Sequence, residues 1–255
     1  MKKKENKTPS SEIYDDFYFK HACGGHEEFS FSEGETLSSW MSYSLKIAEL
    51  KPGERVLDLG TGRGEIAYHA AKIGCFSIGL DYSMAAINLA KTLKTKAQNQ
   101  NILFGLLLSD ARFLPFNKDQ FDVVFVLDIV EHLAQPDLKK VLNEIYTCLR
   151  PGGRLVIHTM PNLNYYTWGY PVYRSLMRLL GRKLPKDPRK RFYHGEVHVN
   201  IQSPKTMRTT LMETNFNDVK VNLLQLSGSK LKKMICGLFF LKNILANDIV
   251  AIARK

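Results

Sequence analysis

The sequence predicts an α/β fold with an open, seven-stranded, mostly parallel sheet that carries helices on both faces. Strand-like and helix-like segments alternate between Arg55 and Thr159, a pattern typical of consecutive strand–helix–strand units. A glycine-rich turn follows the first of these strands, and Pro-Gly pairs at Pro52 and Pro151 interrupt the pattern as turns do. With 255 residues, 44% of them apolar, the chain can bury a substantial core.

The individual elements follow from local patterns. Apolar residues at helical spacing indicate a first helix that ends before Pro52. Ser83 is a good N-cap for a later helix, and Pro151 with the two glycines after it ends another. The expected helices are 37–50, 65–73, 83–98, 137–149 and 203–214, and the expected strands are 55–59, 76–80, 102–108, 121–127, 154–159, 219–226 and 248–253.

Two parts of the chain depart from this alternation. Residues 1–36 are expected to form an N-terminal arm, with a mobile, charged tail over 1–11 and an irregular, aromatic-rich stretch over 13–31. The rest, 37–255, is expected to form one domain with a lid-like insertion at 161–200, after the fifth strand. Connections of this length are usually functional or disordered.

Charge and cysteine content limit the partners and the compartment. The formal net charge of +11 suggests an anionic partner, either nucleic acid or a membrane surface, although a merely basic surface is an equal alternative. Four cysteines without a C-x-x-C pair suggest reduced thiols and a cytoplasmic protein. No signal peptide is visible, and no apolar run reaches the roughly 18–20 residues of a membrane-spanning helix.

The glycine-rich turn predicts a nucleotide site. Gly60, Gly62 and Gly64 are spaced G-x-G-x-G where the first strand gives way to a helix, and glycine lets a ligand approach the backbone closely. Asp81 ends the second strand about twenty residues later, where a carboxylate can accept hydrogen bonds from both ribose hydroxyls. The spacing differs from the dinucleotide G-x-G-x-x-G, and Asp58 stands where such a site carries an apolar residue, so NAD is disfavoured.

Five motifs in order resemble the class I S-adenosylmethionine (SAM)-dependent methyltransferases. They are VLDLGTGRG (56–64), GLDYS (79–83), SDARFLPF (109–116), FDVVFVLDIVEHL (121–133) and LRPGGRLVIHTMPN (149–162). The resemblance covers about residues 50–162 closely and the two closing strands loosely. It implies a Rossmann-like fold, SAM as cofactor and methyl transfer as the activity. The methyltransferases of ubiquinone and menaquinone biosynthesis are a looser analogy.

The resemblance also implies roles for individual residues. The loop Gly60-Thr61-Gly62 with Gly64 would pass beside the methionine part of SAM, which Asp58 would help to position. Asp81 would hold the ribose, and Tyr82 would stack near the adenine. Asp110, with the backbone of Ala111, would bind the adenine amino group, and Leu127 would end the fourth strand near the reacting methyl.

Two side chains are candidates for proton transfer from the acceptor. His132 follows the fourth strand in an E-H-L triplet, and histidine is tunable around neutral pH, although a structural role is an equal alternative. Asp128 is the second candidate. His198, in the segment that returns from the insertion, could line the acceptor pocket or serve packing. No metal site is expected, because the group around Cys23 lacks further ligands.

The insertion bears on the acceptor. Its aromatic, apolar and basic residues between Tyr165 and Arg191 fit either a lid or a helix in a membrane interface, and 230–245 has a similar composition. We therefore expect a small-molecule or lipid-linked acceptor, methylated at oxygen, with possible contact to an anionic membrane. An RNA methyltransferase and a non-catalytic SAM-binding protein are the alternatives; no N-P-P-Y motif for amino methylation follows the fourth strand.

Overall fold

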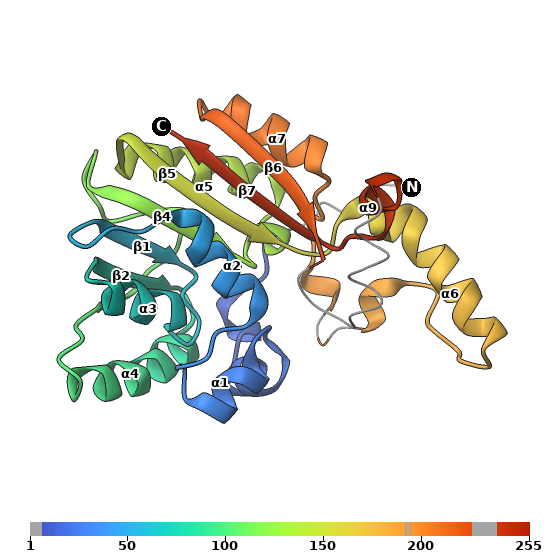
Figure 1. The fold of residues 1–255 in the computed structure, drawn as a ribbon, viewed down its shortest axis with the longest axis horizontal. Helices are drawn as coiled ribbons and strands as arrows, with labels where there is room; N and C mark the ends of the chain where they lie inside the picture. Colours follow the sequence, from blue (N-terminus) through green and yellow to red (C-terminus); the bar gives the residue numbers. More distant parts are fainter. Residues whose placement is uncertain (1–6, 192, 194, 226–238) are drawn as a thin grey trace.

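The computed structural model describes residues 7–191, 193, 195–225 and 239–255. Its centre is a seven-stranded sheet in the order β3-β2-β1-β4-β5-β7-β6 (Figure 1). Strand β7 runs antiparallel to the other six. The strands are β1 (Arg55–Leu59), β2 (Phe76–Asp81), β3 (Gly105–Leu108), β4 (Phe121–Leu127), β5 (Leu149–Thr159), β6 (Asn217–Leu224) and β7 (Asp248–Arg254). The predicted fold class is confirmed.

Helices cover both faces of the sheet, as predicted. One face packs against α2 (Ser39–Ala48) and α3 (Glu65–Ile73), with α4 (Met84–Gln98) beside α3. The other face packs against α5 (Gln135–Cys148) and α7 (Pro204–Glu213). Strand β4 is buried on both faces and is apolar at every position except Asp122, as is typical of parallel strands between two helical layers.

Several element boundaries differ from the sequence prediction. The third strand begins at Gly105 rather than at residue 102, and the fifth begins at Leu149, so the Pro-Gly-Gly stretch belongs to the strand. Ser83 caps its helix as predicted, and Ser203 caps α7 in the same way. Of the expected apolar helix over 230–245, only α9 (Phe239–Leu245) lies within the described residues.

The N-terminal arm is helical, not irregular. It contains η1 (Ser11–Ile13), η2 (Tyr18–Ala22) and α1 (His26–Ser32). The expected mobile tail is also partly fixed, because Thr8 hydrogen-bonds to Asp137 and accepts the N–H of Ala134 at 2.9 Å. Local sequence patterns missed this because the arm is held by contacts with distant residues.

One buried arginine ties the arm to the glycine-rich loop. The Arg63 guanidinium donates to the carbonyls of Phe19 and Gly24, at 2.9 and 2.8 Å, and pairs with Glu65 at 2.8 Å. The side chains of Arg63 and Glu65 are each only 2% exposed. Breaking a buried pair leaves an uncompensated charge, which is far more costly than the pair itself is worth.

The position of the insertion is also clear in Figure 1. Its helix α6 (Tyr170–Leu179) extends away from the sheet, preceded by η4 (Tyr165–Gly169). The chain then returns through η5 (Pro188–Arg191) and η6 (Gly195–Val197). Within the described residues, no helix is both long and apolar enough to cross a bilayer. Cys23, Cys75 and Cys148 are free thiols, and Cys236 lies outside the described residues.

Arg63→Met is expected to lower the free energy of unfolding by about 3–5 kcal/mol, because Glu65 loses its counter-charge. Adding Glu65→Met should recover most of this loss, as urea unfolding would show. Arg150→Met, which removes a surface pair with Asp122, is the control and should cost less than about 1 kcal/mol. Equal losses in Arg63→Met and Arg150→Met would contradict the anchoring role.

Candidate active site

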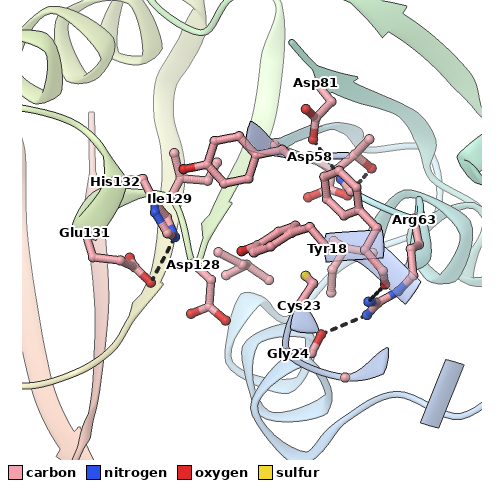
Figure 2. A pocket seen from close by; sticks show the side chains of 18 of the residues that line it. Tyr18, Cys23, Gly24, Asp58, Arg63, Asp81, Asp128, Ile129, Glu131 and His132 are labelled. Atoms are coloured by element: carbon pink, nitrogen blue, oxygen red, sulfur yellow. Dashed lines mark hydrogen bonds and ion pairs between the residues drawn. The ribbon is translucent and has the colours of Figure 1, made fainter. Parts of the chain in front are cut away.

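A cavity of about 430 Å³ lies at the carboxyl ends of the parallel strands, beneath the N-terminal arm. Ligands of open α/β sheets bind at this edge, and the volume is in the range of small-molecule sites. Figure 2 shows Asp58 and Asp81 on one side of it and Asp128, Glu131 and His132 on the other. Every residue predicted for the cofactor or for catalysis lines this cavity, apart from Gly64.

The glycine-rich loop has the backbone that its sequence predicts. Gly60, Gly62 and Gly64 all have positive φ, of 70°, 54° and 87°, which residues with a Cβ rarely adopt. Gly60 is also sterically confined, since an added Cβ would stand 2.2 Å from Cδ1 of Ile129. The N–H groups of Gly60 and Thr61 donate to the carbonyl of Leu80, at 2.7 and 2.9 Å, which joins the loop to β2.

Asp81 is positioned by backbone donors. Its carboxylate accepts the N–H of Gly62 at 3.0 Å and that of Ser83 at 2.9 Å. Burial raises its pKa to about 6, despite these hydrogen bonds. The carboxylate therefore joins the loop to the start of α4 and faces the cavity.

Asp58 is the second buried carboxylate on this side. It is 3% exposed and accepts the Thr61 hydroxyl at 2.6 Å. Burial raises the pKa of Asp58 to about 7, and the charges of Asp81 and Glu65 add to this shift. Thr61 thus supports Asp58 through its side chain, a role that the sequence motif does not specify.

The residues predicted to bind the base lie together beyond β2. Tyr82, Asp110 and Ala111 line the same cavity. The Asp110 carboxylate is held by Arg112 through a two-pronged ion pair, with Nη2 at 2.6 Å and Nε at 3.0 Å. This arginine lowers the pKa of Asp110, although burial opposes the shift. The pair was not predicted from the sequence, because both residues lie in a turn.

A buried imidazolium holds Asp128 in place. His158 on β5 lies between two carboxylates, with Nδ1 at 2.6 Å from Asp128 and Nε2 at 3.2 Å from Asp248. Its ring stacks on Trp40 at a centroid distance of 4.8 Å. Although burial alone would lower the pKa of His158, the two carboxylates raise it to about 10. Asp128 has a φ of 55° at the end of β4.

His158 was missed as a site residue because its partners come from β4 and β7, far apart in sequence. Asp248 belongs to the last strand, and Asp128 to the turn after the fourth. A histidine inside an apolar strand is consistent with many roles. The pairing of the fourth and fifth strands could have revealed this contact, because it brings Leu127, the neighbour of Asp128, opposite His158.

Glu131 and His132 lie in η3 (Val130–His132), directly after β4. Glu131 is 2% exposed and accepts the Thr159 hydroxyl at 2.6 Å. Burial, with the charge of Asp128, raises the pKa of Glu131 to about 8. Burial lowers the pKa of His132 to about 3, so its ring is neutral. The ring of His198 stands 5.0 Å from that of His132.

The arm closes the cavity from above with residues that the motifs do not predict. Tyr14, Tyr18 and Cys23 line the cavity, and burial raises the pKa of the Cys23 thiol to about 11. Tyr14 lies against Tyr82 and His132, at centroid distances of 5.7 and 5.6 Å. The arm therefore contacts both sides of the site.

The residues present fit SAM on structural grounds. The lining of the cavity includes Gly60 and Gly62 of the loop and, after β3, Asp110 and Ala111. The buried carboxylates of Asp58 and Asp81 and the half-buried carboxylate of Asp128 suit a ligand that carries a positive charge and a diol. Asp81 offers oxygens for the diol at the end of β2.

Comparisons with known proteins agree with this fit. Residues 57–157 match the family model described as a methyltransferase domain. The demethylmenaquinone methyltransferase of Lactococcus lactis is 30% identical over 69% of this chain and 71% of its own length. The ubiquinone/menaquinone biosynthesis C-methyltransferase of Neisseria meningitidis is 25% identical over 71% of this chain and 74% of its own.

The fold is also similar to that of solved methyltransferases. A SAM-dependent methyltransferase from Archaeoglobus fulgidus superposes with a TM-score of 0.59 at 21% identity, covering 89% of this chain and 99% of that one. Together with the 30% identical relative and a cavity whose glycine loop and carboxylates suit the cofactor, this shows that the chain is an enzyme that uses SAM and belongs to the class I SAM-dependent methyltransferases.

Proposed function

We propose that this enzyme transfers the SAM methyl group to an oxygen of a hydroxylated, lipid-linked small molecule. The observation that carries the proposal is the polar wall of Asp128, Glu131 and His132, which faces the cavity beside apolar residues such as Ile129. Two relatives are named as methyltransferases of quinone biosynthesis, one of them as a C-methyltransferase, so transfer to a ring carbon is the alternative.

The cofactor would occupy the half of the cavity next to β1 and β2. Asp81 would accept the ribose hydroxyls, and the loop Gly60–Gly64 with Asp58 would hold the amino-acid end. Tyr82, Asp110 and Ala111 would surround the adenine, while Leu127 would contact the cofactor near the methyl group. When bound, SAM supplies a methyl group activated by its sulfonium.

The acceptor would occupy the half next to β4 and η3. Asp128 would accept the hydroxyl proton, because one of its oxygens is fixed by the His158 imidazolium and the carboxylate lines the cavity. His132 would contact the acceptor oxygen through a neutral ring rather than remove the proton, since an imidazole with a pKa of about 3 is a weak base. The enzyme's main task is then alignment.

Asp81→Ala is expected to weaken binding of S-adenosylhomocysteine by about 2–4 kcal/mol, because two hydrogen bonds to a charged acceptor are lost. Titration calorimetry measures this directly. Asp218→Ala, which removes an exposed carboxylate on β6, is the matched control and should bind normally. Unchanged affinity in a folded Asp81→Ala protein would refute the ribose assignment.

The affinity for S-adenosylhomocysteine should also depend on pH through Asp81. The ribose hydroxyls bind the ionised carboxylate, so occupancy lowers the pKa of Asp81 from its value of about 6 in the free protein. Affinity should therefore be constant with respect to this group above pH 6 and fall by up to about tenfold per pH unit below it. Asp81→Asn should remove this component of the pH profile; an unchanged profile would exclude Asp81 as its source.

Methyl transfer to oxygen is tested with hydroxylated quinol acceptors and SAM labelled in its methyl group. NMR of the product should place the label on oxygen, and a label on ring carbon would overturn the proposed atom while leaving the enzyme class intact. Asp128→Asn is expected to lower kcat by about 10²–10⁴-fold, the usual worth of a proton acceptor. S-adenosylhomocysteine affinity measured in the same variant separates this effect from cofactor loss.

We take residues 37–255 as one domain and residues 1–36 as an arm that covers it. Within this domain, the insertion over 161–200 would serve two purposes. Its returning part contributes Tyr193, Val197 and His198 to the cavity, so that part would close over the acceptor. Helix α6 contributes no residue to the cavity lining. The cavity lining therefore does not support a lid role for α6, and we propose instead that this helix contacts another surface.

Helix α6 presents an apolar stripe to solvent. Val172, Leu176 and Leu179 are 65%, 52% and 84% exposed, and Leu180 beyond the helix is 65% exposed. Arginines follow and interleave with this stripe. An exposed apolar face with adjacent basic residues suits the headgroup region of an anionic membrane, so we place the enzyme at the inner face of a membrane, as a peripheral protein.

Co-sedimentation with vesicles tests this placement. Binding should rise with the anionic lipid fraction and fall with salt, because the Debye length is only about 8 Å at physiological ionic strength. Replacing Leu176, Leu179 and Leu180 with Ser should reduce binding by at least about tenfold through lost apolar burial. Leu103→Ser, at a residue 70% exposed on another surface, is the control. Binding that ignores lipid charge and the triple substitution would remove the membrane from the proposal.

A further inference from the structure

Three side chains with metal-binding chemistry meet in the acceptor half of the cavity. Glu131 and His132 come from η3, and His198 follows η6. One ligand atom from each lies within 4.8 Å of the other two. Two imidazoles and one carboxylate are the donor set that divalent first-row transition metals prefer. The sequence alone did not reveal the cluster, because His198 is more than sixty residues away from η3.

The spacing suits ligation better than hydrogen bonding. His132 Nε2 lies 4.0 Å from Glu131 Oε1, which is too long for a hydrogen bond. Ligands at about 2.0–2.2 Å from one tetrahedral ion stand roughly 3.3–3.6 Å apart. The three ligand atoms lie within 4.8 Å of one another, so side-chain rotations would be needed to bring them onto one ion, and rotation of the His132 ring can present either of its nitrogens. The rings of His132 and His198 are inclined by 69° rather than stacked.

His132 has a buried nitrogen that the protein leaves unpaired. The residue is 8% exposed, and its Nδ1 has no hydrogen-bond partner among the residues that the structure describes. Burying such an atom without a partner costs free energy. A bound metal ion would give this nitrogen a partner, because a ring nitrogen of histidine is a common ligand of divalent transition metals.

One oxygen of Glu131 faces the cluster. His158 pairs with Asp128 and Asp248 and not with Glu131 among the described residues. Glu131 is left with the Thr159 hydroxyl as its hydrogen-bonding side chain among the described residues. That hydrogen bond fixes one carboxylate oxygen and leaves Oε1 toward His132, as partners outside the coordination shell do in metal sites.

The segments that carry the cluster are themselves connected. The N–H of Asn200 donates to the carbonyl of Glu131 at 3.0 Å, which joins the returning insertion to η3. The N–H of His132 donates to Ile129 at 2.9 Å. His198 therefore does not depend on a free loop for its position near the other two residues.

We propose that Glu131, His132 and His198 bind one divalent transition-metal ion, with Zn²⁺ as the probe, and leave a coordination position open to the cavity. Its role rests on the proposed function: the ion would bind the acceptor oxygen and stabilise the developing oxyanion. The hydroxyl proton passes to Asp128, the oxygen–methyl bond forms as the sulfonium–methyl bond breaks, and the metal keeps its charge. His132 would then act as a ligand.

Metal binding is measured on the full chain without acceptor. After chelator treatment, Co²⁺ should bind at one ion per chain with visible absorption bands typical of nitrogen and oxygen ligands, and Zn²⁺ should displace it. His132→Gln, His198→Gln and Glu131→Gln should each weaken Co²⁺ affinity by at least about tenfold. His21→Gln, which removes an exposed histidine outside the cluster, should leave the affinity unchanged.

The outcomes separate the metal from the proposed reaction. Calorimetry with S-adenosylhomocysteine verifies that each variant is folded, and His198→Gln, at a partly exposed residue, is the variant least prone to misfold. Absence of the Co²⁺ bands, or bands that all three variants retain, overturns the metal site even if oxygen methylation is found. Co²⁺ bound as expected together with methylation at carbon would sustain the site and refute the proposed oxygen transfer.

Discussion

Burial of carboxylates at the carboxyl edge of the parallel sheet is the constraint around which this protein is organised. Asp58, Asp81 and Glu131 are each at most 5% exposed, and burial is the largest cause of the raised pKa of each. Such groups persist only where donors or charges compensate them. The glycine-rich loop supplies backbone N–H groups to Asp81, and Thr61 supplies a hydroxyl to Asp58.

The groups that pair with the buried carboxylates differ between the two sides of the cavity. On the arm side, Arg63 neutralises Glu65 and joins the loop to the arm. On the β4 side, His158 serves Asp128 and Asp248 together, while Glu131 has a hydroxyl. The cavity therefore favours cationic ligands, which would suit the sulfonium of SAM in the proposed cofactor half and the proposed metal ion in the other.

How far the sequence predicts this structure depends on the range of the interactions. The strands β1 and β4 were predicted to the residue, because apolar runs between turn signals define them locally. The arm was misjudged as irregular, since its helices are held by Arg63 from the loop. Likewise, the cofactor residues lie in local motifs, whereas His158 and His198 meet their partners only through sheet pairing and the return of the insertion.

Topology then relates the acceptor half to the surface of α6. The insertion leaves from the carboxyl end of β5, forms α6, and returns to place Val197 and His198 in the cavity. The apolar stripe that includes Leu176 and Leu179 is therefore carried by the segment that also lines the proposed acceptor half of the cavity. A lipid-linked acceptor needs both features, an apolar surface where its tail is held and a polar wall that selects its hydroxyl. Under the proposed function the insertion would supply the first directly and contribute His198 to the second, so substrate choice would reside in the part of the chain that the cofactor does not constrain.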